Sequence, residues 1–165
     1  IVIKLGPTSI AANVAGTTFV SKLIEGKFPD YEQVIPSGES SLLVVDRKIF
    51  SDSLSRVSVL SSEKYKGVRI LTKENILNIS ANNPEKEQGE ENVPCEYSGN
   101  EIDIAFNVNY LQEILSTIDS EKIEINFFGS EKSCLITDPN SDDLKYVVMP
   151  LLIWCAINKY FHQKF

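Results

Sequence analysis

The feature that most constrains this 165-residue chain is a proline-bracketed stretch near its beginning, residues 28–36, with the sequence FPDYEQVIP. Pro29 and Pro36 have no backbone N–H and a fixed φ, so the stretch cannot continue a helix or lie inside a central strand. We predict an extended connector between two folded parts. Its apolar residues Val34 and Ile35 are expected to pack against a neighbouring surface.

The part before the connector has the pattern of short strands separated by turn residues. Alternating segments at residues 1–5, 9–14 and 17–24 are divided by a Gly-Pro pair and by Gly16. Three strands without a helix make an incomplete sheet, and the chain begins without a methionine. We therefore expect this part to be the end of a domain whose beginning is absent.

The part after the connector alternates strands with two helices. Apolar residues recur at helical spacing over residues 49–60, after the candidate N-cap Asp46, and a second helix is predicted to begin after Asn107. An acidic stretch, residues 84–92, is predicted to lie between strands. The order predicts an α+β fold in which two similar βαβββ-like halves place two helices against antiparallel sheets. The predicted strands cover residues 42–45, 68–72, 76–81, 93–97, 101–106, 122–128, 133–137 and 144–149.

Composition and charge narrow the class of protein. A hydrophobic content of 42%, a charged content of 24% and a net charge of −7 are typical of a soluble globular protein. Positive residues cluster between residues 45 and 69, whereas residues 82–103 are strongly acidic. The longest apolar run is too short to span a membrane, so a cytoplasmic location is expected. Three cysteines without CxxC spacing predict reduced, buried thiols.

Residue patterns for catalysis are missing from the sequence. The single histidine, His162, lies near the carboxyl end, and there is no Gly-rich phosphate loop, GxSxG or HExxH. The acid pairs Asp142–Asp143 and Glu90–Glu91 lie in polar runs typical of solvated surface. We expect no catalytic residue, no metal and no cofactor, and a small acidic hydrolase stays a minor alternative.

Four segments carry a resemblance to a known family. They are SKLIEGKFPDYEQVIP at residues 21–36, SEKYKGVR at 62–69, ANNPE at 81–85 and YVVMP at 146–150. In this order they resemble the bacterial DNA polymerase III β subunit, the sliding clamp. The resemblance implies three parts: the end of the middle domain with its connector (1–36), the carboxy-terminal domain (37–151) and a tail (152–165).

The resemblance implies a DNA-clamp fold and a function without catalysis. Family members form a ring-shaped homodimer that encircles duplex DNA without sequence specificity. They tether the polymerase, clamp-loader subunits and repair proteins through short linear peptides. A stand-alone peptide-binding or inhibitory adaptor that does not encircle DNA is the alternative, because encirclement needs further domains.

The resemblance also implies three groups of site residues. Gln33 departs from the basic residue that some members carry at its position, which puts a charged contact with the peptide in doubt. The partner-peptide cleft would contain Pro29, Gln33, Val34, Asn107, Tyr110, Ser133, Val147, Met149, Pro150 and Leu151. The ring interface would contain Val59, Leu60, Glu85, Glu87, Glu90 and Glu91. The DNA-facing residues would be Arg47, Lys48 and Arg56.

The tail, residues 152–165, has no counterpart in the family pattern. Three alternatives stay open for it. It folds back over the cleft, it packs elsewhere, or it is the frameshifted or read-through end of a damaged gene, which we rank first.

Overall fold

The computed structural model describes residues 1–26 and 30–151, without the side chains of residues 142 and 143. Its contacts divide the chain into two units, Ile1–Tyr31 and Glu32–Phe165. The predictions for Pro29 and for the tail at residues 152–165 lie outside the described residues. The boundary between the units falls inside the predicted connector.

The first unit contains a three-stranded antiparallel sheet in the order β1-β2-β3. A two-residue turn joins the last two strands, and both of its residues have positive φ, 49° at Ala15 and 83° at Gly16. Such a turn is of type I′, whose twist matches that of the flanking strands. The three-strand prediction is confirmed. The strands are β1 (Val2–Leu5), β2 (Ser9–Val14) and β3 (Thr17–Lys22).

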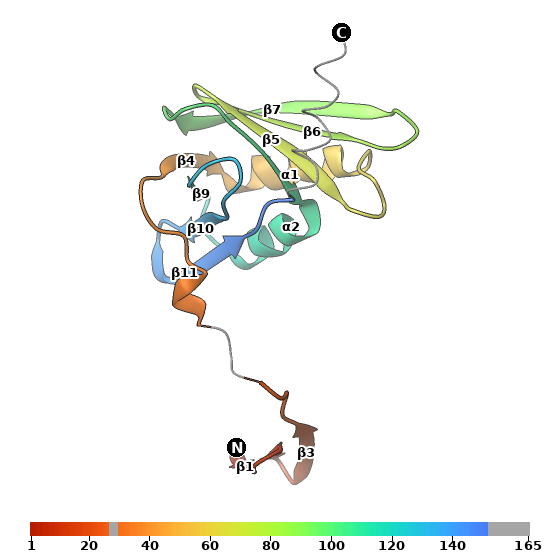
Figure 1. Cartoon of the computed structure of the whole chain (residues 1–165), viewed down its shortest axis with the longest axis vertical. Helices are drawn as coiled ribbons and strands as arrows, with labels where there is room; N and C mark the ends of the chain where they lie inside the picture. The colour runs from red at the N-terminus through yellow and green to blue at the C-terminus, as the bar shows by residue number, and fades with distance from the viewer. Residues whose placement is uncertain (27–29, 152–165) are drawn as a thin grey trace. The chain divides into compact units, whose positions relative to one another are not determined.

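The second unit consists of two βαβββ halves, as predicted (Figure 1). A short 3-10 helix, η1 (Tyr31–Gln33), crosses the boundary between the units. The first half contains β4 (Ser41–Asp46), α1 (Arg47–Ser58), β5 (Gly67–Lys73), β6 (Ile76–Asn82) and β7 (Gln88–Tyr97). The second half contains β8 (Ile102–Asn107), α2 (Val108–Thr117), β9 (Lys122–Phe127), β10 (Cys134–Asp138) and β11 (Ser141–Val148).

The first strand of each half pairs with a strand of the other half, and β4 also pairs with β7 of its own half. In the strand order β11-β10-β9-β4-β7-β6-β5-β8, β4 of the first half pairs with β9 of the second, and β8 pairs with β5. Leu151, just beyond β11, donates its N–H to the carbonyl oxygen of Ala105 in β8 over 2.8 Å. The two ends of the strand order therefore meet, and neither half completes its sheet without the other.

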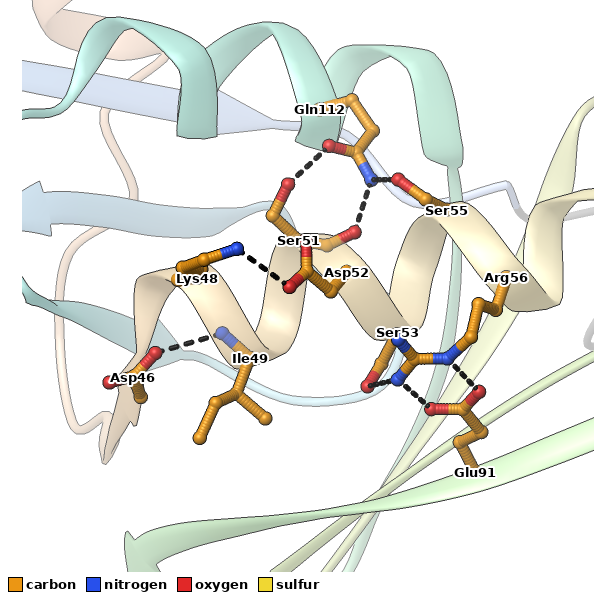
Figure 2. A network of polar contacts seen from close by, with 10 residues as sticks. All are labelled: Asp46, Lys48, Ile49, Ser51, Asp52, Ser53, Ser55, Arg56, Glu91 and Gln112. Carbon is orange, nitrogen blue, oxygen red and sulfur yellow. Dashed lines mark hydrogen bonds and ion pairs between the residues drawn. The ribbon is translucent and has the colours of Figure 1, made fainter.

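The helices begin at the predicted caps. The carboxylate of Asp46 accepts from the N–H of Ile49 over 2.8 Å, and the Asn107 side chain accepts from the N–H of Asn109 over 2.9 Å (Figure 2 shows the first). Each bond satisfies one N–H that the first helical turn leaves unpaired. Both N-cap predictions are confirmed.

One apolar core is shared by the helices and the inner faces of the strands. Phe50, Leu54 and Val57 of α1 are buried, and so are Leu111 and Leu115 of α2. Their spacing of three or four residues places them on one face of each helix. In the part of the chain that the structure describes, no helix is long and apolar enough to cross a membrane.

The sequence prediction was wrong for the beginning of β7. This strand starts at Gln88, inside the acidic stretch, and residues 88–94 pair with β6. Acidic residues disfavour strands only weakly when pairing is available, because β propensity depends largely on the neighbouring strand. Here Ser80↔Glu90 and Ile79↔Glu91 provide that pairing.

Candidate functional site

Several predicted cleft residues lie together where β11 and β8 end. The hydrogen bond from Leu151 to Ala105 brings the end of the described chain to β8, whose last residue, Asn107, caps α2. Cys134 in β10 pairs with Val148 in the antiparallel strand β11. Ser133, just before Cys134, and Met149, just after Val148, therefore lie at the same end of this strand pair. The described cleft candidates of the second half therefore come from one corner of the fold.

This corner exposes unusual apolar surface. The Met149 side chain is 65% exposed and the Tyr110 ring, in the first turn of α2, is 59% exposed. Val147, Pro150 and Leu151 are half-buried. An exposed methionine can accommodate apolar side chains of different shapes, because its side chain is flexible and polarizable.

The connector candidates occupy the beginning of the second unit. Gln33 ends η1 and Val34 follows it with 40% of its surface exposed. Ile35 is half-buried, which agrees with the prediction that it packs against a neighbouring surface, but the same prediction was wrong for Val34, which is exposed. The expectation that Val34 and Met149 share one cleft stays a prediction.

The ring-interface candidates lie just beyond α1, in the turn before β7 and on β7. Val59, the C-cap of α1, is 80% exposed. Leu60 is half-buried and lies against Gly89 of β7, where an added Cβ would stand 2.7 Å from the Leu60 Cδ1 atom. These two neighbouring apolar residues thus differ in exposure: Val59 faces solvent, whereas Leu60 packs within the domain.

The acidic interface candidates also differ in the hydrogen bonds that they make within the domain. Glu85 and Glu90 are exposed, but Glu87 accepts from Asn83 Nδ2 over 2.6 Å and so fixes the turn before β7. Glu91 accepts two hydrogen bonds from Arg56, each of 2.6 Å. These bonds, followed by one from Ser53, lower the pKa of Glu91 to about 2.

Two of the three DNA-facing candidates have their guanidinium groups engaged within the protein. Arg47 donates through Nε to the Ser120 carbonyl over 2.9 Å and through Nη1 to the Leu115 carbonyl over 3.2 Å, at the end of α2. Arg56 binds Glu91. The Lys48 side chain is 79% exposed and pairs with Asp52 one turn further along α1 at 3.0 Å. The DNA contact of these residues stays a prediction.

The titratable groups of the described residues do not form a metal-binding cluster of three or more His, Cys, Asp or Glu. Cys95 and Cys134 are free, and burial raises the pKa of Cys95 to about 11 and that of Cys134 to about 12. Thiols with such pKa values are protonated near neutral pH and react slowly. Cys155 lies outside the described residues.

Sequence reasoning missed three residues that organise these surfaces. Gln112 of α2 binds Ser51 and Ser55 of α1, and the Ser53 hydroxyl accepts from Arg56 Nη2 (Figure 2). Gly89 makes room for Leu60. None of them forms a motif with its neighbours in the sequence. The one available signal for Gly89 is its place as a glycine among glutamates and glutamines.

Solved structures place this fold in one class. The sliding clamp of Pseudomonas aeruginosa matches with a TM-score of 0.82 and 44% identity over 90% of this chain and 41% of that chain. The Bartonella birtlesii clamp, solved bound to griselimycin, matches with a TM-score of 0.83 and 32% identity over 90% of this chain and 40% of that chain. The fold is that of the DNA sliding clamps.

The family model described as the C-terminal domain of the DNA polymerase III beta subunit matches residues 32–152. The chain belongs to this family. Among curated relatives, the beta sliding clamps of Pseudomonas aeruginosa and of Escherichia coli K12 are 44% and 38% identical over 149 residues. These 149 residues are 90% of this chain and 41% of each relative, so the chain spans less than half the length of the relatives it matches.

Proposed function

We propose that this chain is the carboxy-terminal part of a bacterial DNA polymerase processivity factor. In the complete protein, a ring-shaped homodimer would encircle duplex DNA in the cytoplasm without sequence specificity and would act without catalysis. The single observation that supports this most is the family match over residues 32–152. The closed ring around the duplex, rather than tight contact with the DNA, would then hold the polymerase on its template.

The corner at the end of β11 is proposed to bind partner peptides. An apolar anchor of the peptide would contact Met149, Val147, Pro150 and Leu151, with Val34 of the connector on the other side. Asn107, Tyr110, Ser133 and Gln33 offer polar groups at its margin that would set the peptide register. The partners would be tail peptides of polymerases, clamp-loader subunits and repair proteins.

Calorimetry with a peptide copied from the tail of a bacterial replicative polymerase tests this cleft. Met149→Asp should weaken binding at least about 30-fold, because it places a charge where an apolar anchor would be desolvated. Val59→Asp is the matched control, since it adds the same charge to an exposed apolar residue that is not one of the cleft candidates. Unchanged affinity in Met149→Asp would remove the cleft from this corner.

The residues after α1 and those around the beginning of β7 are proposed as the ring interface. Val59 offers exposed apolar surface, and the exposed carboxylates of Glu85, Glu87 and Glu90 would meet basic residues of the partner. Leu60 and Glu91, which contacts Arg56, would support this surface from within the domain. Residues 88–92 of β7 pair with β6 on one side, and β4 pairs only from Cys95 onward among the described strands. The other side of residues 88–92, which we call the β7 edge, offers backbone groups to a strand of the partner.

Association of the chain with the isolated first domain of the Pseudomonas aeruginosa clamp tests this interface. Analytical ultracentrifugation should show a complex that Val59→Asp disrupts and Met149→Asp leaves intact. Equal effects of the two variants would contradict the assignment of separate surfaces. Because each variant serves as the control for the other surface, the interface and the cleft are tested independently.

The helices are proposed to face the duplex in the complete ring. Of Arg47, Lys48 and Arg56, the contacts favour Lys48 as the residue available to phosphates, because the two guanidinium groups bind protein atoms. Weak contact suits a protein that must slide. We expect no tight binding of duplex DNA by this chain in a gel shift at physiological salt, and tight binding would contradict the proposal.

The exposed apolar residues Met149 and Tyr110 are also compatible with one second candidate, a peptide-binding adaptor that sequesters clamp partners without encircling DNA. Both candidates predict peptide binding. A continuous reading frame that encodes two further similar domains before residue 1 would support the ring, whereas a start codon immediately upstream would support the adaptor.

A further inference from the structure

The last turn of α1 is joined to the first half of β7 by an ion pair (Figure 2). Arg56 Nε donates to Glu91 Oε1 and Nη2 donates to Glu91 Oε2, both over 2.6 Å. The same Nη2 lies 3.1 Å from the hydroxyl oxygen of Ser53, one turn earlier in α1. Two parallel bonds between a guanidinium and a carboxylate fix the relative orientation of both groups, which a single point contact does not.

Just beyond α1, the chain makes a second contact with β7 through apolar groups. Leu60 follows Arg56 by four residues and Gly89 precedes Glu91 by two, so the two pairs lie in register along the helix and the strand. An added Cβ at Gly89 would stand 2.7 Å from Leu60 Cδ1. The helix and strand therefore touch at two successive positions, one polar and one apolar.

The strand alternation separates these contacts from the outer surface. Gly89, Glu91 and Val93 are at least half-buried, while Glu90 and Asn92 between them are exposed. Successive side chains of a strand point to opposite faces, so Glu91 faces α1 and Glu90 faces outward. The Glu91 side chain is 29% exposed, compared with 70% for Glu96 further along the same strand.

The first half of β7 needs such support. Among the described strands, residues 88–94 pair with β6 alone. Residues 95–97 pair with β4 on one side, and on the other side Cys95 and Tyr97 exchange backbone hydrogen bonds with Asn75, just before β6. A strand segment paired on one side opens more readily than one paired on both. The contacts with α1 therefore act on the segment that has the fewest backbone partners.

We propose that Arg56 and Glu91 are positioning residues, an intramolecular latch that holds the β7 edge against α1 and thereby fixes Val59 beside it. This inference rests on the proposed ring interface for its purpose. It gives Arg56 a role that is separate from DNA contact, and it gives Glu91 a role within its own subunit. The negative charges near Arg56 are Glu91 and Asp52, and Lys48 pairs with Asp52.

Hydrogen exchange of the backbone amides tests the latch in the full 165-residue chain. Arg56→Gln and Glu91→Gln should each speed exchange of the amides at residues 88–92 about threefold to fivefold, without a matching change at residues 95–97. Exchanging the charges, with Arg56→Glu and Glu91→Arg together, should restore most of the protection. No change at residues 88–92, or an equal change throughout the domain, would overturn the latch.

Glu96→Gln is the matched control, since Glu96 forms an ion pair with Lys122 at 2.6 Å on the second half of the same strand. It removes a carboxylate from β7 without touching the latch. Exchange at residues 88–92 should therefore stay at the wild-type rate in this variant. Acceleration there equal to that of Glu91→Gln would overturn the proposal, because any charge loss on β7 would then suffice.

Association with the first domain of the Pseudomonas aeruginosa clamp separates the latch from the ring proposal. If wild type associates, Arg56→Gln should weaken association and the charge exchange should restore it. Weakening without restoration would mean that Arg56 contacts the partner directly, which overturns the positioning role. If wild type does not associate, the ring proposal fails, while the exchange data still decide whether the latch exists.

Discussion

Gln112 on α2 binds Ser51 on α1 through both ends of its side-chain amide. The Ser51 hydroxyl donates to Gln112 Oε1 over 2.8 Å, and Gln112 Nε2 donates to the Ser51 carbonyl oxygen over 2.8 Å and to the Ser55 hydroxyl over 3.0 Å (Figure 2). The two helices belong to different halves of the domain. One side-chain amide therefore joins the two halves at their helices, in addition to the strand pairs β4–β9 and β5–β8.

Removing this amide should weaken the whole domain. Gln112→Ala deletes three hydrogen bonds from a half-buried side chain and should lower the free energy of unfolding by about 1–2 kcal/mol. Urea unfolding followed by circular dichroism measures the change. Glu113→Ala, at the exposed neighbouring position, should stay within about 0.5 kcal/mol of wild type. Equal stabilities of the two variants would show that the amide does not join the halves.

The turn between β7 and β8 should not tolerate a side chain at Gly99. An added Cβ would stand 2.7 Å from Ser41 Cβ and 2.7 Å from the Tyr97 hydroxyl oxygen. That hydroxyl already donates to the Asn100 carbonyl oxygen over 2.5 Å, so it cannot move without losing this bond. Gly99→Ala should cost about 1–3 kcal/mol of unfolding free energy, as overpacked sites do.

Two variants make the Gly99 prediction specific. Ser98→Ala, at the exposed preceding position, should be nearly neutral. Adding Ser41→Gly to Gly99→Ala should recover part of the loss, because it removes the Cβ atom that the new methyl group would meet. A double variant less stable than the sum of its parts would locate the cost elsewhere.

The sequence predicted those parts of the fold that depend on neighbouring residues. The N-caps Asp46 and Asn107 act within one helical turn, and the buried face of α1 follows from spacing alone. The resemblance to sliding clamps assigns Met149 and Val59 to the two candidate surfaces; both residues are exposed, and their roles stay predictions. Helix caps, the buried face of a helix and a series of family segments in the same order can all be recognised without the tertiary structure.

The parts that were not predictable depend on pairs far apart in the sequence. Residues 88–92 form a strand because β6 pairs with them, and the acidic composition alone indicated otherwise. Arg56 and Glu91 are separated by 35 positions, and nothing near either residue indicates that they form a pair. Leu60 was expected at the ring interface like Val59, but Gly89 gives it space within the domain.

The Arg56–Glu91 pair should make stability depend on pH in acid. The pKa of Glu91 is lowered from 4.5 to about 2, first by the hydrogen bonds from Arg56 and then by that from Ser53. A lowered pKa stabilises the fold above the unfolded-state value, and the contribution is lost as the pH falls toward the folded-state value. The urea midpoint of wild type should therefore exceed that of Glu91→Gln above pH 4.5, and the difference should shrink between pH 4.5 and 2.

The Arg56→Gln background provides the control for this pH dependence. Without the guanidinium, Glu91 loses the main cause of its lowered pKa. The effect of adding Glu91→Gln to Arg56→Gln should then be smaller and should vary less with pH. A difference between wild type and Glu91→Gln that stays constant down to pH 3 would contradict the assignment.

The two described cysteines should differ in reactivity. Cys134 is 1% exposed in β10 and burial raises its pKa to about 12, whereas Cys95 in β7 is half-buried with a pKa of about 11. Alkylation proceeds through the thiolate and needs access to the sulfur, so both factors favour Cys95. In a Cys155→Ser background, iodoacetamide at pH 8 should modify Cys95 before Cys134, as mass spectrometry of the digested chain can show. In urea the two rates should become similar, and modification of Cys134 first in the folded chain would contradict its burial in the core.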